Sequence, residues 1–138
     1  MHLHPVARPD LATAWPVAEP WLARACARPG CDLAVEDLRA LVAAEAALLV
    51  LILDADGTPI GAGVTQVREL ADGGRSCCVL AAGGTNVRRW RDIMGVIEAG
   101  AARNGCSRVE FVGRVGWAAL LPDYQVDAYY VKNLEVAR

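Results

Sequence analysis

Residues 90–134 decide the fold, and they read WRDIMGVIEAGAARNGCSRVEFVGRVGWAALLPDYQVDAYYVKNL. Apolar residues recur at helical spacing, which predicts a long helix from Val87 to Asn104 that stops at Gly105. The buried stripe of this helix is predicted to be Trp90, Ile93, Met94, Ile97 and Ala101. The segments Val109–Val112 and Val126–Val131 have the length and the β-branched and aromatic content of strands. This part of the chain therefore predicts a helix, a strand, a short glycine-rich corner and a closing strand.

The residues before this stretch predict two helices. Leu11, Trp15, Ala18, Leu22 and Ala25 recur at helical spacing, and the Arg-Pro-Gly sequence at 28–30 stops that helix. A second helix carries Val35, Leu38, Leu41 and Val42 on one side, and Asp32 is positioned to cap it. Residues 2–9 contain Pro5 and Pro9 and are predicted to be irregular.

Three strands are predicted between the second and third helices. Turn-forming residues at 54–59 and 71–74 separate apolar segments of strand length. The predicted strands are Leu48–Leu53, Ile60–Leu70 and Ser76–Ala82.

The order of these elements gives the fold class. Because a helix connects Ser76–Ala82 to Val109–Val112, these two strands are expected to be parallel neighbours. The other connections are hairpins, so the prediction is an α+β fold with a mixed, mostly antiparallel sheet, two N-terminal helices and one long crossover helix. A chain of 138 residues supports one core, so 1–138 is predicted to be a single domain.

Composition excludes several classes of partner. The formal net charge is −2 and charged residues make up 22% of the chain. Nucleic-acid binding needs a concentrated basic face, so no nucleic-acid partner is expected. The longest apolar run has the length of a strand and not the ~20 residues that span a bilayer, so no membrane partner is expected either.

The five cysteines do not form a recognisable metal or disulfide framework. Cys26 and Cys31 have no second Cys or His pair nearby to complete a tetrahedral zinc site, so no metal is expected. Cys77 and Cys78 are adjacent and point to opposite faces of the predicted strand. Reduced thiols are the better interpretation, while the redox state itself stays open.

In its order of elements the chain resembles the GNAT (Gcn5-related N-acetyltransferase) superfamily over essentially its whole length. Within that superfamily it is most similar to small GNAT-like proteins encoded by tailed bacteriophages and prophages. The residues that carry the resemblance are Trp90, the ARNGC sequence at 102–106, VEF at 109–111, GRVGW at 113–117 and KNL at 132–134. The resemblance implies an acetyl-CoA site whose pyrophosphate lies on a glycine-rich loop at the start of the long helix.

The sequence departs from that implied site. Gly83 and Gly84 precede the helix, and Arg88 offers a positive charge, but the family's x-Gly-x-Gly spacing is missing. The general-acid tyrosine is also missing from its place near Trp117. We therefore expect no catalytic residue and no cofactor, and any acetyl-CoA binding should be weak and salt-sensitive. The alternative retains acetyl-CoA, with Gly83, Gly84 and Arg88 as cofactor-binding residues and either Glu110 or Tyr124 in proton transfer.

The corner after the predicted strand Val109–Val112 is interpreted as structural. Its residues are Gly113, Arg114, Gly116 and Trp117. Trp117 is expected to be largely buried, so that its replacement by alanine would remove ~3–5 kcal/mol of stability.

Two functions are compatible with these residues. The first is a non-catalytic GNAT-fold phage or prophage protein, a structural or assembly component of the head–tail region or tail of the virion. It would be assembled in the host cytoplasm, bind other virion proteins and form a homo- or hetero-oligomer through its tryptophans, which are Trp15, Trp21, Trp90 and Trp117. The alternative is an acyl-CoA-dependent N-acetyltransferase of the bacterial cytoplasm with a divergent cofactor loop.

Overall fold

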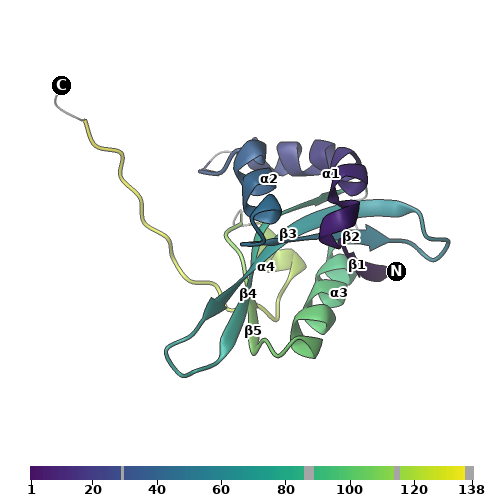
Figure 1. The fold of residues 1–138 in the computed structure, drawn as a ribbon. Coiled ribbons are helices and arrows are strands. Elements are labelled where there is room, and N and C mark those ends of the chain that lie inside the picture. The colour runs from purple at the N-terminus through teal and green to yellow at the C-terminus, as the bar shows by residue number, and fades with distance from the viewer. Residues whose placement is uncertain (29, 86–88, 114–115, 136–138) are drawn as a thin grey trace.

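The computed structural model describes residues 1–28, 30–85, 89–113 and 116–135. Within them, one sheet has the strand order β1-β2-β3-β4-β5, with helices on both faces (Figure 1). The strands are β1 (His2–Pro5), β2 (Leu48–Leu53), β3 (Pro59–Glu69), β4 (Arg75–Gly84) and β5 (Arg108–Glu110). The helices are the 3-10 turn η1 (Arg8–Asp10), α1 (Leu11–Cys26), α2 (Val35–Ala43), α3 (Trp90–Arg103) and α4 (Trp117–Leu120).

Helices α1 and α2 cover one face of the sheet. Trp15, Ala18 and Leu22 recur along one side of α1 and are buried against Leu49 and Leu51 of β2. The helix continues through Pro16 and Pro20, since apolar burial along its whole length outweighs the lost backbone hydrogen bonds. The two helices are confirmed, and this layer holds the larger part of the core.

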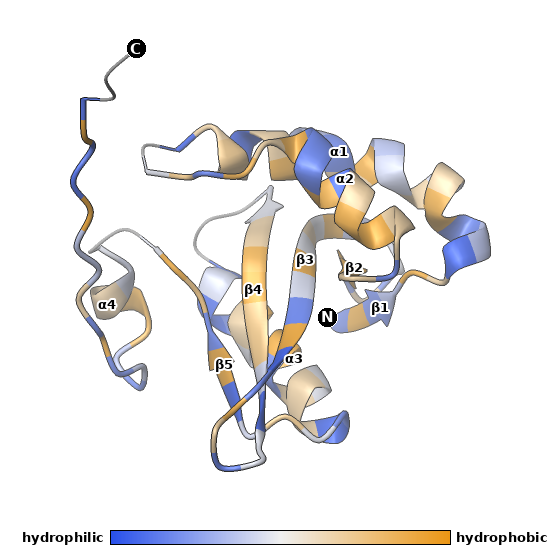
Figure 2. Ribbon diagram, turned by 60° about the vertical axis from the view of Figure 1, so that its left-hand side comes forward, coloured by the Kyte–Doolittle hydropathy of each residue, from blue (hydrophilic) through white to orange (hydrophobic). Residues whose placement is uncertain are grey.

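Helix α3 covers the other face. Its buried residues include the predicted stripe of Trp90, Ile93, Met94, Ile97 and Ala101. They pack with Ile52 of β2 and Val79 of β4. In Figure 2 the half of β4 that lies between the helix layers is coloured as hydrophobic, while its other end is hydrophilic. Along the chain this helix connects β4 to β5. The two strands are parallel neighbours, as predicted, with Cys77 of β4 paired with Val109 of β5.

Two parts of the fold differ from the sequence prediction at the N-terminal end. Residues 2–5 form an edge strand instead of an irregular segment, with His2 paired to Leu53. Pro5 is tolerated there because an edge strand does not need every N–H. Asp32 does not cap α2. The side chain of Asp37 instead accepts a 2.9 Å hydrogen bond from the N–H of Ala34.

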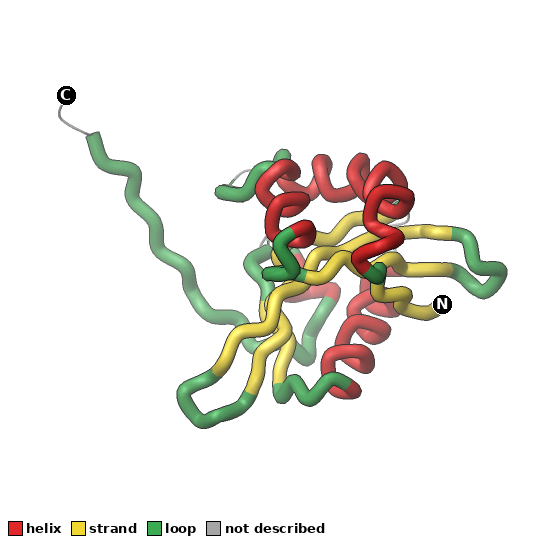
Figure 3. The backbone as a smooth tube through the Cα atoms, viewed as in Figure 1, coloured by secondary structure: helices red, strands yellow, loops and turns green. Residues whose placement is uncertain are grey.

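The predicted closing strand is the main error. Residues 126–131 pair with no strand in the part of the chain that the structure describes. After Tyr124 the chain runs away from the body as an extended segment (Figures 1 and 3). Tyr129 and Tyr130, which lie in this segment, are both exposed.

No helix among the described residues is long and apolar enough to cross a membrane.

Candidate functional site

A gap opens between β4 and the chain that follows β5. The two strands are paired only as far as Cys78 and Glu110, whereas β4 continues to Gly84. A bulge bends β4 at this point, because Val79 and Ala81 face consecutive residues of β3 and leave Leu80 as the extra residue. The parting of parallel strands therefore creates a wedge-shaped opening at the edge of β4.

The edge of β4 inside this gap has unpaired backbone groups. The N–H of Thr85 donates to the carbonyl of Ile60 on β3 at 3.0 Å. Since successive residues of a strand direct these groups to opposite sides, Gly83 bonds to β3 while Ala82 and Gly84 direct theirs into the gap. A strand edge of this kind is a template for an extended polar ligand.

Apolar and aromatic side chains form the walls of the gap. The cavity measures about 490 Å³. Trp117 packs edge-on against Trp90, with ring centroids 5.4 Å apart, and against Phe111 at 5.8 Å. Trp117 is partly buried and packs against the apolar cluster under α3. Trp117 also lines the cavity.

The predicted glycine pair lies in this cavity, but packing explains why both positions are glycine. A Cβ on Gly83 would lie 2.6 Å from the carbonyl oxygen of Trp21 in α1. A Cβ on Gly84 would lie 2.7 Å from the carbonyl oxygen of Ile60. Gly83 and Gly84 thus let α1 and β3 approach β4, and they also line the gap. Arg88 lies outside the described residues.

Arg24, in the last turn of α1, and Arg28, two residues after the helix ends, border the cavity. Arg24 is exposed, and Arg28 donates a 2.9 Å hydrogen bond to the carbonyl oxygen of Val112. The sequence does not show that this end of α1 lies beside β4, so neither arginine was predicted as a site residue.

The glycines of the corner differ in what they contact. A Cβ on Gly113 would lie 2.8 Å from the ring of Phe111 and 3.0 Å from that of Trp117. Gly113 therefore allows the two rings to meet, which supports a structural role. Gly116 faces open space, and Arg114 lies outside the described residues.

Glu110 is held in an ion-pair network outside the gap. Its carboxylate lies 2.9 Å from Arg68 and 3.0 Å from Arg108, and it accepts a 2.7 Å hydrogen bond from the hydroxyl of Ser76. The hydrogen bond from Arg68, then that from Ser76, lower the pKa of Glu110 to about 2. A carboxylate so firmly ionised and engaged is a poor general base.

We expect this network to make the stability of the protein sensitive to acid. Because the pKa of Glu110 is lower in the folded protein than in the unfolded chain, its ionised carboxylate stabilises the fold above the ordinary pKa of a glutamate. This stabilisation is lost as the pH falls toward 2. Glu110→Gln should therefore lower stability near neutral pH by about 1 kcal/mol, because partly exposed ion pairs are strongly screened. It should also flatten the decline of the melting temperature between pH 5 and pH 2. An unchanged acid decline would show that the network does not matter to stability.

Tyr124 lies with Glu110 in a groove on the outer side of β5, not in the gap. Its hydroxyl donates a 2.7 Å hydrogen bond to Glu98 of α3, and its ring packs edge-on against Phe111 at 5.6 Å. Burial and the Glu98 carboxylate raise the pKa of Tyr124 well above its usual range. The structure therefore brings the two alternative catalytic residues near each other and leaves both away from the candidate cofactor site.

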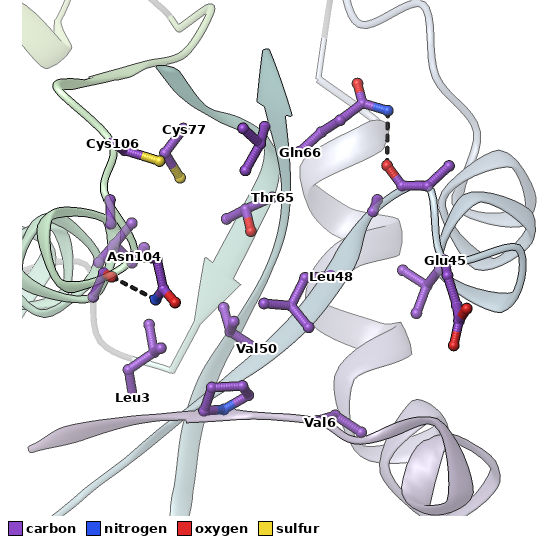
Figure 4. Close-up of a pocket in the computed structure, with 18 of the residues that line it drawn as sticks. Leu3, Val6, Glu45, Leu48, Val50, Thr65, Gln66, Cys77, Asn104 and Cys106 are labelled. Atoms are coloured by element: carbon purple, nitrogen blue, oxygen red, sulfur yellow. Dashed lines mark hydrogen bonds between the residues drawn. The ribbon is translucent and has the colours of Figure 1, made fainter. Parts of the chain in front are cut away.

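A second hollow lies on the α3 face of the sheet, between β1, β2 and the end of α3 (Figure 4). It measures about 730 Å³, and Cys77 and Cys106 line it together with Asn104, which bonds to Gly100. Burial raises the pKa of Cys77 to about 11, so this thiol is protonated at neutral pH and unreactive. The described residues contain no group of three or more His, Cys, Asp or Glu side chains arranged to hold a metal ion.

The geometry resembles that of solved acetyltransferases along the entire chain. A probable acetyltransferase superposes with a TM-score of 0.68 at 10% identity, covering 100% of this chain and 99% of the other. The fold is that of the GNAT acetyltransferases. A GNAT family acetyltransferase of Staphylococcus aureus gives 0.65 at 12% identity, covering 97% and 100%. A ribosomal-protein-alanine N-acetyltransferase of Brucella melitensis gives 0.61 at 17% identity, covering 99% and 100%.

At these identities the likenesses establish the fold alone. No family model matches the sequence, and no curated protein does. The expected α+β fold and the resemblance to GNAT proteins are thus confirmed, while the resemblance to phage proteins stays a prediction.

Proposed function

We propose that this protein binds an acyl-CoA thioester in the gap between β4 and the chain after β5, and that it transfers the acyl group to an amine. The observation that carries this proposal is the free backbone edge of Ala82 and Gly84 inside an apolar cavity. The proteins of the same fold named above are acetyltransferases by their own descriptions, which supports the same assignment.

The residues of the cavity fit such a ligand. The N–H and C=O groups of Ala82 and Gly84 match the amide groups of an extended pantetheine chain. Phe111 and Trp117 keep water from one side of it. Arg24 is exposed at the rim, where a guanidinium attracts phosphate. The strand edge of β4 and the charge of Arg24 thus offer contacts for both parts of the ligand.

The chemistry of the site rests on the backbone. Acyl-CoA supplies a thioester whose carbonyl is open to attack by an amine. A backbone N–H directed into a cavity with little water stabilises negative charge on a carbonyl oxygen. Among the described residues that line the cavity there is no His, Asp or Glu, so the attacking amine is expected to arrive already deprotonated. The rate should then rise with pH up to the pKa of the amine.

Calorimetric titration with acetyl-CoA and with CoA at low ionic strength tests binding. We expect micromolar affinity that weakens with salt, because phosphate is held by exposed charge. Arg24→Glu should weaken binding about tenfold or more, equivalent to at least 1.4 kcal/mol. Arg103→Glu makes the same charge change on an exposed residue of α3 that does not border the cavity, so it should bind normally.

Release of free CoA in the presence of a panel of amines tests transfer. Thiol release that depends on both the amine and Arg24 would support the proposal. No heat with either ligand at millimolar concentration would overturn it.

A non-catalytic role in the assembly of a phage particle is the second candidate. It is favoured by the exposed apolar segment after Tyr124, which offers a surface for other proteins. Binding of acetyl-CoA without thiol release for any amine would favour this role over catalysis.

A further inference from the structure

The segment formed by residues 125–135 carries an unusual amount of exposed apolar surface. Tyr130 is 91% exposed. The other large hydrophobic residues exposed here are Val126, Tyr129, Val131 and Leu134. Figure 2 shows hydrophobic and hydrophilic residues following one another along this extended chain. Valine and tyrosine favour strands, so the segment has the composition of a strand without a neighbour.

The β5 edge of the same chain cannot pair with most of this segment. Tyr124 is fixed beside Phe111 at the end of β5 by ring packing and by its hydrogen bond to Glu98. A chain that ran back along β5 from there would place 125–127 opposite 110–108, where this three-residue strand begins. Tyr129 and the apolar residues after it would lie beyond that edge. The β5 strand of another copy is equally short.

We propose that residues 125–135 pair antiparallel with the same segment of a second copy of this chain, forming a two-fold symmetric dimer. In an isologous contact the same surface of both copies is covered, so each segment is the other's strand partner. In the register centred on Tyr130, each Tyr130 faces the other across the axis. The remaining opposed pairs are Val126 with Leu134, Asp127 with Asn133, Ala128 with Lys132, and Tyr129 with Val131.

The sequence selects this register over its neighbours. Centring on Tyr130 places large apolar residues opposite each other and opposes no like charges, and both features stabilise paired strands. Centring on Tyr129 would set Asp127 against Val131 and Val126 against Lys132. Centring on Val131 would set Asp127 against Glu135. Only registers centred on a residue satisfy the symmetry, because opposed side chains must lie on the same face of the ribbon.

Light scattering on the whole protein, with Tyr130→Lys as the test variant, decides between a dimer and a monomer. We expect the unchanged protein to be a dimer and the variant to dissociate, with its dissociation constant raised about tenfold or more. Val17→Lys removes an exposed apolar side chain from α1 and should leave the dimer intact. A monomeric unchanged protein, or a dimer that survives Tyr130→Lys, overturns the proposal.

A second experiment tests the register. Under mild oxidation Tyr130→Cys should form a disulfide between two chains, because the two sulfurs face each other across the axis. Tyr129→Cys is the matched control, since its partner is Val131 and self-linkage should be much slower. Equal cross-linking at the two positions, with the native protein as background for its own five cysteines, overturns the symmetric register.

Discussion

Trp15→Ala is expected to remove about 3–5 kcal/mol from the free energy of unfolding, a large fraction of the stability of a domain this size. Trp15 is 2% exposed and lies in the core that α1, α2 and the sheet share. Its removal leaves a cavity the size of an indole between layers that cannot close onto each other. Chemical denaturation followed by circular dichroism would measure the loss.

Trp15→Phe is the matched variant. The indole Nε1 is buried, and it has no hydrogen-bond partner among the described residues. Phenylalanine keeps most of the ring volume and removes this unsatisfied N–H, so the variant should lose about 1 kcal/mol or less. It also weakens the contact with Arg39, whose guanidinium lies 5.9 Å from the ring. If the two variants were equally destabilised, ring volume would not be the source of the effect.

The elements whose periodicity is long and regular could be predicted from the sequence. The stripe from Trp90 to Ile97 repeats at helical spacing, and the helix stops near the glycine at 105. Two strands that are connected by a helix packed on their sheet run parallel, and the structure pairs β4 with β5 in this way. Local pattern and chain topology are enough for this part of the fold.

The strand predicted over 126–131 failed for a physical reason. Its length and its content of valine and tyrosine are those of a strand. A strand also needs a neighbour for its backbone groups, and the sequence does not identify that neighbour. The reverse error occurred at 2–5, where Pro5 indicated an irregular segment although β2 supplies hydrogen bonds. The tryptophans show the same limit, because Trp15 and Trp90 are buried in the core and are not available for interfaces.

The candidate site was predictable only where it coincides with a local signal. The glycine pair marked the end of β4 in the sequence, and the structure places it in the gap. Arg24 in the last turn of α1 and Arg28 just after it reach the same gap from more than fifty residues away in the chain. Only the packing of α1 on β4 in the folded protein creates this proximity.

Gly83→Val is expected to remove about 3 kcal/mol of stability, at the upper end of what overpacking usually costs. A Cβ at this position would lie 2.6 Å from the carbonyl oxygen of Trp21 and 3.1 Å from its carbonyl carbon. Both atoms belong to the backbone of α1, so no side-chain rotation relieves the clash and the helix must move away from β4. Because that end of α1 carries Arg24, binding of CoA should weaken along with stability. Thermal unfolding and calorimetric titration of the same variant measure the two effects.

Gly95→Ala separates this mechanism from a general effect of replacing glycine. Gly95 lies on the exposed side of α3, and a Cβ there would meet nothing within 4 Å. Since alanine favours the helix more than glycine does, this variant should be more stable by about 0.5–1 kcal/mol and should bind CoA unchanged. A Gly83→Val protein as stable as the parent would mean that α1 does not approach β4 this closely. Stability lost without loss of CoA binding would instead place the phosphate-binding charge elsewhere than at the end of α1.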